Sequence, residues 1–379
     1  MHSNPSSEVC CVVVNFFSAG LTIEAVDSFI TQYPQGEIVV VDNSADPQEA
    51  QHLRLGLHPK VKLLTTTGNI GFARACNKAF ELSNRPFVLL LNPDAQLQPD
   101  CVHHLVEALH KHQNLGAVSP LQFWDKRLEW FLPSAWYPTG IGQWALAKGL
   151  RSARAAQRLS QAYRARSLSL WRSESSTVVP QKALSGGAMM IRRAAVAQFD
   201  RLFDPEYFMY FEDSDLCLRL QRAGWQLAIA RQAKVVHEWA NSPGKAELMS
   251  ASQAYYFSKN FAGQGQWEIR LQQALSIGPL TNPLQAQEFS WGHQKLPVPN
   301  ALKDGWLFEV SPSSLMIPSI ASFGYGPAVT IDWKLMRRLA GTGAFFIRIG
   351  SPVQSCGLSH VYKVRPPDNS QAIDPSRNF

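Results

Sequence analysis

The residues best suited to acid–base chemistry are an adjacent acidic pair. Glu212 and Asp213 follow the aromatic stretch at residues 207–211. Burial beside aromatic rings and repulsion between neighbouring carboxylates both raise a carboxyl pKa, which suits a general base. The alternative is structural, because Asp213 could cap a helix that begins near Leu216. The two roles are compatible, since a helix N-terminus also holds a carboxylate in place.

Asp94 is a candidate metal ligand. It ends the motif Asn92-Pro93-Asp94, directly after an apolar run at residues 87–91. A carboxylate after a buried strand is costly to pack but is suited to hold a divalent cation. The alternative is that Asp94 caps the following turn. Asp42 ends another apolar run and poses a similar choice, between contacting a ribose or base and closing an Asx turn.

The elements that must position these residues belong to an α/β fold. Segments with helical spacing alternate with apolar runs, and this alternation predicts parallel strands covered by helices. The predicted buried strands lie at residues 9–15, 37–41, 61–65 and 87–91. The polar residues that follow them are Asn15, Asp42, Asn69 and Asp94. Because ligands bind at the carboxyl ends of such strands, we expect these side chains to share one edge of the sheet.

The loop Gly68-Asn69-Ile70-Gly71 opens a predicted helix, where backbone amides can face a phosphate. The loop lacks the glycine spacings of dinucleotide-binding proteins and of P-loop proteins. The sequence therefore argues against both of these classes.

Changes in composition along the chain predict its division into domains. A length of 379 residues suits two or three domains, and we expect the first at residues 9–262. An aromatic and basic insertion interrupts it at residues 123–175. Prolines, glycines and short apolar runs then predict a β-rich accessory unit at residues 263–366 and a disordered tail at residues 367–379.

The chain shows no sign of secretion or of a membrane span. It contains no apolar run of about eighteen residues, and its start lacks the basic and apolar pattern of a signal peptide. The six cysteines include no CxxC pair. We therefore expect a cytoplasmic protein with reduced thiols.

Six short motifs occur in a characteristic order. They are Val12-Val13-Val14-Asn15-Phe16, Val40-Val41-Asp42-Asn43-Ser44, Asn69-Ile70-Gly71-Phe72-Ala73, Leu90-Leu91-Asn92-Pro93-Asp94, Ser185-Gly186-Gly187-Ala188 and Phe211-Glu212-Asp213-Ser214-Asp215-Leu216. In this order they resemble the motifs of family 2 glycosyltransferases. The nearest likeness is to the rhamnosyltransferase-like branch that builds bacterial surface polysaccharides, and it covers residues 9–260.

The resemblance implies a GT-A fold, a nucleotide-diphosphate sugar as donor and inversion at the anomeric carbon. It implies that Asp213 deprotonates the acceptor hydroxyl, with Glu212 in the acceptor site. The residues it assigns to the donor nucleotide are Asn15, Asp42, Asn69, Arg74 and Asn92. Asp94 and His237 are assigned to a divalent metal, Mn²⁺ or Mg²⁺. Asn92 stands where the metal-binding motif often has a carboxylate.

The basic segment at residues 148–172 carries seven lysines and arginines and no acidic residue. It could bind nucleic acid, lie on an anionic membrane surface or form a solvated helix face. No zinc spacing or RNA-binding motif accompanies it, so we expect no nucleic-acid partner. The other two alternatives stay open. The resemblance implies a glycan or polyprenyl-linked acceptor, which would place the enzyme at the inner face of the cell membrane, and a homodimer is a further alternative.

Two other functions compete with glycosyl transfer. A non-catalytic nucleotide-sugar binding protein would be expected to lose carboxylates, yet Asp94, Glu212 and Asp213 are all present. A sugar-phosphate nucleotidyltransferase would carry a glycine-rich loop with a cation after its first strand. Residues 15–20 contain no cation, which argues against this class.

Overall fold

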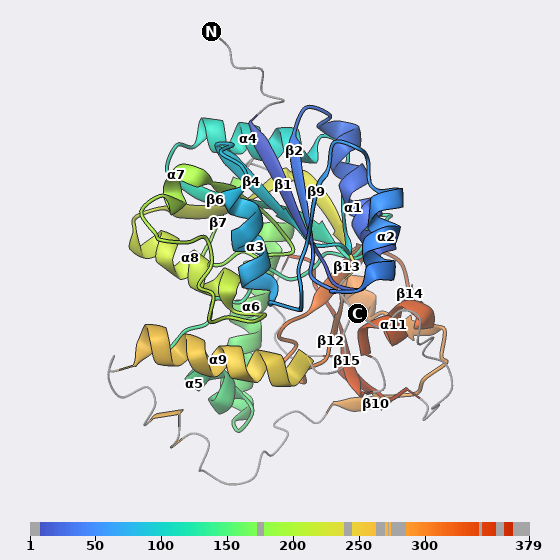
Figure 1. Ribbon diagram of the computed structural model, residues 1–379. Coiled ribbons are helices and arrows are strands. Elements are labelled where there is room, and N and C mark those ends of the chain that lie inside the picture. The colour runs from blue at the N-terminus through green and yellow to red at the C-terminus, as the bar shows by residue number, and fades with distance from the viewer. Residues whose placement is uncertain are drawn as a thin grey trace.

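The computed structural model describes residues 8–172, 178–238, 245–262, 270–271, 273, 286–340, 343–353 and 360–366. Within these residues the chain forms a large α/β sheet and a separate group of C-terminal strands (Figure 1). The predicted α/β fold with a β-rich C-terminal unit is confirmed. The predicted disordered tail lies outside the described residues. The boundary near residue 263 also falls outside them and stays a prediction.

The first sheet contains nine strands within the described residues, in the order β3-β2-β1-β4-β8-β6-β9-β5, with β7 beside β9. The strands are β1 (Val9–Asn15), β2 (Glu37–Asp42), β3 (Lys62–Thr65), β4 (Phe87–Leu91), β5 (Ala95–Leu97), β6 (Leu115–Phe123), β7 (Val178–Gln181), β8 (Ala188–Arg192) and β9 (Gln226–His237). Strands β1 to β4 pair in parallel, as predicted. Strand β8 runs antiparallel to both β4 and β6.

Helices cover both faces of this sheet. They are α1 (Ala19–Gln32), α2 (Pro47–Gly56), α3 (Phe72–Glu81), α4 (Cys101–Lys111), α7 (Arg193–Val196), α8 (Glu212–Arg222) and α9 (Lys245–Phe261). Successive side chains of a strand point to opposite faces. In β1, Val12 therefore packs in the core with α3 and α8, whereas Val13 packs in the core with α1 and α4. Burial on both faces explains the continuous apolar run of β1.

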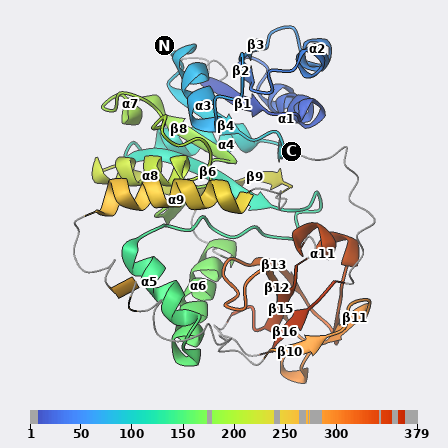
Figure 2. The same cartoon turned by 60° about the horizontal axis from the view of Figure 1, so that its bottom comes forward.

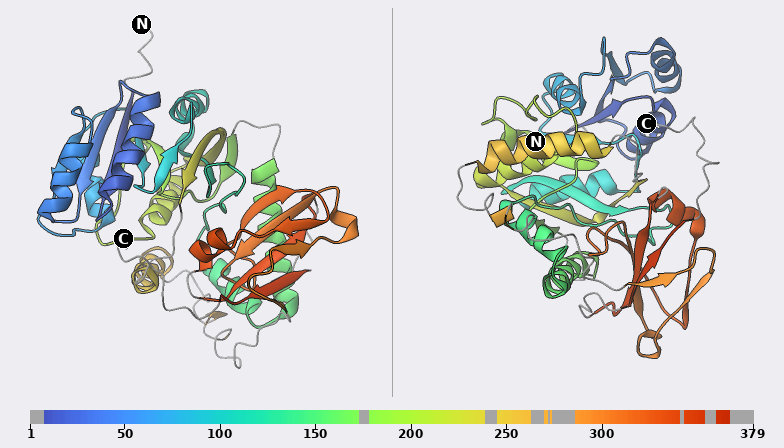
Figure 3. Two further views of the ribbon diagram at one scale, coloured as in Figure 1. Left: turned by 90° about the vertical axis from the view of Figure 1, so that its right-hand side faces the viewer. Right: turned by 90° about the horizontal axis from the view of Figure 1, so that it is seen from below.

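The C-terminal unit contains a five-stranded sheet in the order β10-β16-β15-β12-β13 and a two-stranded sheet of β11 and β14. Its elements are β10 (Gln287–Phe289), β11 (Lys295–Pro297), the 3₁₀ helix η2 (Asn300–Leu302), β12 (Trp306–Ser311), β13 (Ile320–Gly324), β14 (Ala328–Thr330), α11 (Trp333–Ala340), β15 (Phe345–Gly350) and β16 (Val361–Val364). The views in Figure 3 show these strands gathered apart from the first sheet. Phe131 connects the two parts, since it forms β-bridges with both Phe123 and Ala321.

The basic insertion folds into two helices, α5 (Gly140–Gly149) and α6 (Ala153–Arg172). Figure 2 shows α6 beside strands of the C-terminal sheet. Arg164 of α6 and Arg348 of β15 bind the same carboxylate, Glu309 of β12, and all three side chains are fully buried. The distances are 2.7 Å from Arg164 Nε to Glu309 Oε2 and 2.6 Å from Arg348 Nη2 to Glu309 Oε1. A buried ion cluster therefore joins the insertion to the C-terminal unit.

This cluster corrects one alternative for the basic segment, namely that it is a uniformly solvated face. Arg164 is buried, and Arg166 is half-buried and donates a hydrogen bond to Gln181 Oε1 at 3.0 Å. Lys148, Arg154 and Arg158 are exposed. Only part of the segment's positive charge thus faces the solvent.

We predict that Glu309→Gln lowers the free energy of unfolding by about 3–5 kcal/mol, because it leaves two buried guanidinium groups without their carboxylate. Urea unfolding followed by circular dichroism measures the effect. The matched control is Glu288→Gln, since the Glu288 side chain is 62% exposed and forms loose ion pairs with Lys363 at 3.7 Å and Arg365 at 3.9 Å. This control should change stability by less than about 1 kcal/mol. Equal effects of the two substitutions would contradict a stabilising role for the cluster.

Candidate active site

The carboxyl ends of β1 and β2 bring two predicted site residues together. Asn15 and Asp42 are partners in the parallel register, and Asn15 Nδ2 donates a hydrogen bond to Asp42 Oδ1 at 3.0 Å. Asn15 is fully buried, and its amide oxygen accepts hydrogen bonds from Ser18 and Thr22 of the following helix start. Its nitrogen also donates to Glu49 Oε1 at 3.1 Å. Asn15 therefore holds the ends of β1 and β2 together. Its amide group already makes hydrogen bonds within the fold, so few are left for a ligand.

Asp42 is 1% exposed, and only one of its carboxylate oxygens is used within the described fold. Its Oδ1 accepts hydrogen bonds from Asn15 and from the backbone amide of Ser44. Among the described residues, Oδ2 makes no hydrogen bond. A carboxylate oxygen at the end of a parallel strand can accept a hydrogen bond from a ribose or base. Asp42 thus fits the donor contact predicted for it.

Asn69 organises the loop before α3. Its Oδ1 accepts hydrogen bonds from Asn43 Nδ2 at 2.8 Å and from the amide of Gly71 at 3.0 Å. Asn43 Oδ1 in turn accepts from the amide of Ile70 at 3.0 Å. Sequence reasoning missed Asn43 as a site residue, although its position directly after Asp42 was a usable signal. Both asparagines act on the loop backbone.

Arg74, which we expect near the donor nucleotide, contacts the segment before the acidic pair. Its Nε donates to the carbonyl of Pro205 at 2.9 Å, and its Nη2 lies 3.7 Å from Glu206 Oε1. The structure therefore connects Arg74 to the segment before the acidic pair. A Cβ on nearby Gly71 would lie 2.6 Å from the carbonyl oxygen of Phe208 in that segment, so the close approach requires glycine.

Asp94 and His237 face each other at 3.2 Å, between Asp94 Oδ1 and His237 Nε2. The other ring nitrogen, Nδ1, lies 3.1 Å from Gln122 Oε1. An amide oxygen only accepts hydrogen bonds, so Nδ1 donates to Gln122, and Nε2 is the ring nitrogen that faces Asp94. Asn92 Nδ2 lies 3.5 Å from the same Nε2. Gln122 was not predicted as a site residue.

This pair fits a divalent cation. Two acceptor atoms at 3.2 Å require a proton or a cation between them. Adjacent ligands of an octahedral ion with bonds of about 2.1 Å lie about 3 Å apart. No group of three or more His, Cys, Asp or Glu side chains arranged for a metal occurs among the described residues. A cation here would therefore need further oxygen ligands from a substrate, as Mg²⁺ commonly does with phosphates.

The acidic pair begins α8. Asp213 Oδ2 accepts a hydrogen bond from the amide of Gly186 at 3.0 Å, and Oδ1 accepts from the amide of Ser214 at 2.6 Å. Burial raises the pKa of Asp213 above its ordinary value, although these amide hydrogen bonds oppose the rise. Glu212 is 6% exposed, whereas Asp213 is half-buried. Asp213 is thus the member of the pair that a substrate can reach.

Glu212 is held in an apolar setting. Its Oε2 is buried without a hydrogen-bond partner in the described part of the chain. Burial, and then repulsion from Asp213, raise the pKa of Glu212 to about 8. Burial therefore favours the neutral form of Glu212, whereas the amides of Gly186 and Ser214 favour the charged form of Asp213.

Two neighbouring glycines connect the acidic pair to the metal pair. Gly186 donates to Asp213, as described above, and Gly187 packs against His237. A Cβ on Gly187 would lie 2.3 Å from His237 Cε1, so this contact requires glycine. The carbonyl of Gly187 also accepts a hydrogen bond from the amide of Asn92 at 2.9 Å. The structure thus gathers Asp213, His237 and Asn92 around two consecutive residues.

The raised pKa of Glu212 predicts a pH-dependent stability. A carboxyl group with a raised folded-state pKa stabilises the fold at low pH, and this contribution is lost as pH rises from the ordinary value of 4.5 to about 8. We expect Glu212→Gln to remove this loss, so that the variant gains stability relative to the parent across that range. Thermal unfolding between pH 5 and 9 measures the difference. A constant difference at all pH values would contradict the assignment.

Comparisons with known proteins extend this description. Residues 5–255 match the profile of the family described as "Glycosyltransferase like family 2". The chain is 29% identical over 293 residues to N-acetylglucosaminyl-diphospho-decaprenol L-rhamnosyltransferase of Mycobacterium tuberculosis, an alignment that covers 71% of this chain and 90% of the relative. It is 25% identical over 229 residues to a low-salt glycan biosynthesis hexosyltransferase of Haloferax volcanii, covering 59% of this chain and 65% of that relative.

Solved structures give a weaker likeness. A mannosyltransferase from Pyrobaculum calidifontis in complex with GDP-Man and Mn²⁺ superposes with a TM-score of 0.46 and 17% identity, over 73% of this chain and 66% of that chain. The family assignment depends instead on the profile match, which spans most of the chain, including both the Asp94 and the Asp213 regions. The chain belongs to glycosyltransferase family 2.

Proposed function

We propose that this protein transfers a sugar from a nucleotide-diphosphate donor to a hydroxyl of a lipid-linked saccharide in cell-envelope polysaccharide biosynthesis, with inversion at the anomeric carbon. One observation carries the proposal. Asp213 accepts a hydrogen bond from the amide of Gly186, and His237 packs against the next residue, Gly187. This placement supports a base and a diphosphate-binding cation within one site of the GT-A type. The name of the Mycobacterium tuberculosis relative specifies rhamnosyl transfer to a lipid-linked acceptor, which favours dTDP-rhamnose as donor over a UDP-sugar.

The transfer requires one displacement. Asp213 takes the proton of the acceptor hydroxyl as the hydroxyl oxygen forms a bond to the anomeric carbon. The bond from that carbon to the diphosphate oxygen breaks, and its electron pair leaves with the nucleoside diphosphate. Attack opposite to the departing oxygen inverts the configuration of the carbon. The raised pKa of Asp213 makes its carboxylate a stronger proton acceptor than an ordinary aspartate.

Asp94 and His237 would hold a Mn²⁺ or Mg²⁺ ion through one carboxylate oxygen and one imidazole nitrogen. When bound, the cation offsets the negative charge that develops on the diphosphate. Gln122 orients the His237 ring through Nδ1. For the nucleoside, Asp42 supplies the free Oδ2, while Asn15 and Asn69 position the strand end and the loop.

The exposed cations of the insertion fit a lipid-linked acceptor. Lys148, Arg154 and Arg158 lie on the solvent side of α5 and α6. Cations near an anionic membrane surface each contribute about 1 kcal/mol to association. Among the described residues, no helix has the length and apolarity of a membrane span. We propose that these side chains hold the enzyme at the membrane surface beside its acceptor.

We predict that Asp213→Asn lowers the transfer rate by at least about 10²-fold, because the amide cannot accept the hydroxyl proton. Binding of the nucleoside diphosphate should remain nearly unchanged, since Asp213 contacts the acceptor. Mass spectrometry of the glycosylated acceptor and calorimetry with the nucleoside diphosphate measure the two quantities. The matched control is Asp200→Asn at an exposed aspartate in the same part of the chain. Persistent transfer in Asp213→Asn would refute the assignment of the base.

We also predict a metal-dependent stabilisation by one nucleoside diphosphate. A ligand that binds only the folded state raises the unfolding temperature. Thermal shifts with dTDP, UDP, GDP and CMP, each with Mn²⁺ or with a chelator, should single out one nucleotide whose shift depends on the metal. Asp94→Ala should abolish the metal-dependent part, whereas the Asp200→Asn control should retain it. An equal shift in chelator would argue against Asp94 and His237 as metal ligands.

A further inference from the structure

The backbone just before the acidic pair is strained. Tyr210 and Phe211 have φ angles of 69° and 66°, in the left-handed region that disfavours residues with a Cβ. Two consecutive residues of this kind persist only where surrounding contacts hold them. Because Phe211 immediately precedes Glu212 and Asp213, whatever holds this turn also sets the position of the proposed base. This turn belongs to the segment at residues 201–211, here called the catalytic turn segment.

A fully buried carboxylate lies next to this turn. Asp215 is 0% exposed and stands one helical position after Ser214 in α8. Three side chains donate hydrogen bonds to it, and a fourth, Lys259, forms an ion pair with it. They are Arg219 Nε at 2.8 Å, Lys259 Nζ at 2.8 Å, Asn260 Nδ2 at 3.0 Å and the hydroxyl of Tyr207 at 3.4 Å. Asp215 thus joins α8 to α9 and to the catalytic turn segment.

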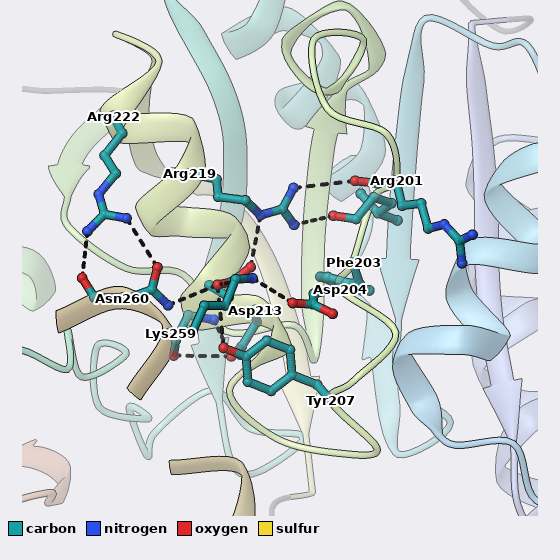
Figure 4. A network of polar contacts seen from close by, with 12 residues as sticks. Arg201, Phe203, Asp204, Tyr207, Asp213, Arg219, Arg222, Lys259 and Asn260 are labelled. Atoms are coloured by element: carbon teal, nitrogen blue, oxygen red, sulfur yellow. Dashed lines mark hydrogen bonds and ion pairs between the residues drawn. The ribbon is translucent and has the colours of Figure 1, made fainter. Parts of the chain in front are cut away.

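Lys259 bridges two carboxylates. Its ammonium lies 2.7 Å from Asp204 Oδ2 (Figure 4). The same ammonium lies 2.8 Å from Asp215 Oδ1. Asp204 belongs to the catalytic turn segment, so a single cation on α9 ties this segment to the first turn of α8. The side chains of Lys259, Asp204 and Asp215 are 28%, 18% and 0% exposed, so solvent screens the bridge less than it screens a surface ion pair.

On its other side, the catalytic turn segment contacts α3, which follows the loop of Asn69. The amide of Phe72, at the start of α3, donates to the carbonyl of Phe208 at 2.7 Å. Asn77 of α3 exchanges two hydrogen bonds of 2.8 Å with the backbone of Phe203. The segment is therefore held between α3 and α9, and Lys259 supplies the only ammonium group on the α9 side among the described contacts.

We propose that Lys259 is a positioning residue for sugar transfer, and that its bridge between Asp204 and Asp215 holds Asp213 where it can reach the acceptor hydroxyl. Lys259 acts through this bridge and does not touch the reacting atoms. Without its charge, Asp204 and Asp215 repel each other and the strained turn loses one of its supports. The others include Ser252, which donates to the carbonyl of Met209, and Tyr255, which donates to Asp204. Arg219 also donates to the carbonyl of Leu202. The inference rests on the proposed function for its effect on rate, but the effect on the backbone does not depend on activity.

Lys259→Met tests the proposal, because methionine keeps most of the chain length and removes the ammonium. We expect hydrogen exchange of the backbone amides at residues 204–212 to quicken at least about tenfold. We also expect kcat to fall by about 10²-fold at a nearly constant KM for the donor, since a displaced base affects the chemical step. Lys259→Arg retains the charge and should restore most of kcat. Lys303→Met, at an exposed lysine of the C-terminal unit, is the matched control.

The outcomes separate the two proposals. If Lys259→Met shows exchange and kcat equal to those of Lys303→Met, the positioning role is overturned. A lower unfolding temperature with unchanged kcat also overturns it, because that result shows a purely structural role. If the parent protein transfers no sugar, the proposed function fails, and the exchange rates alone decide whether Lys259 holds the turn. If Lys259→Met does not fold, Asp204→Asn removes one arm of the bridge and takes its place in the same measurements.

Discussion

The proposed site depends on the close approach of side chains to the backbone at Gly186 and Gly187. A Cβ on Gly187 would overlap the ring of His237, so a larger residue would force this ring away from Asp94. The neighbouring amide of Gly186 holds Asp213 by a direct hydrogen bond. This short loop precedes β8, which pairs with β4 and therefore lies beside Asn92 and Asp94. The antiparallel insertion of β8 into the sheet is what brings the acidic pair to the edge that the parallel strands create.

Much of this arrangement could be predicted from the sequence, because short runs of neighbouring residues indicate where the strands lie and where they end. The run of apolar residues in β1 reports burial on both faces, and the polar residues Asn15, Asp42 and Asp94 report the strand ends. The six motifs identified the family, and the family profile confirms it. The assignments of individual site residues stay predictions. Asn15 shows why, since its type and position suggest a ligand contact while its hydrogen bonds are all used within the fold.

The features that the sequence did not predict are long-range pairings. Arg164 and Glu309 are separated by 145 positions, and no local pattern indicates that one will neutralise the other. The same limit applies to Arg74, whose partner Pro205 lies 131 positions away. In both cases the arginine contacts a residue that is distant in the sequence. The basic segment consequently divides into a buried face, which joins the C-terminal unit, and an exposed face with Lys148, Arg154 and Arg158.

The central claim is a single displacement assisted by one base, and the stereochemistry of the product tests it most directly. The measurement is the anomeric configuration of the newly formed linkage, obtained by nuclear magnetic resonance after incubation with the nucleotide sugar that stabilises the protein and a lipid-linked saccharide acceptor. Our account predicts that the configuration is inverted relative to the donor, because the acceptor oxygen attacks opposite to the leaving diphosphate. A retained configuration would contradict it, since retention requires a mechanism other than one direct displacement activated by Asp213.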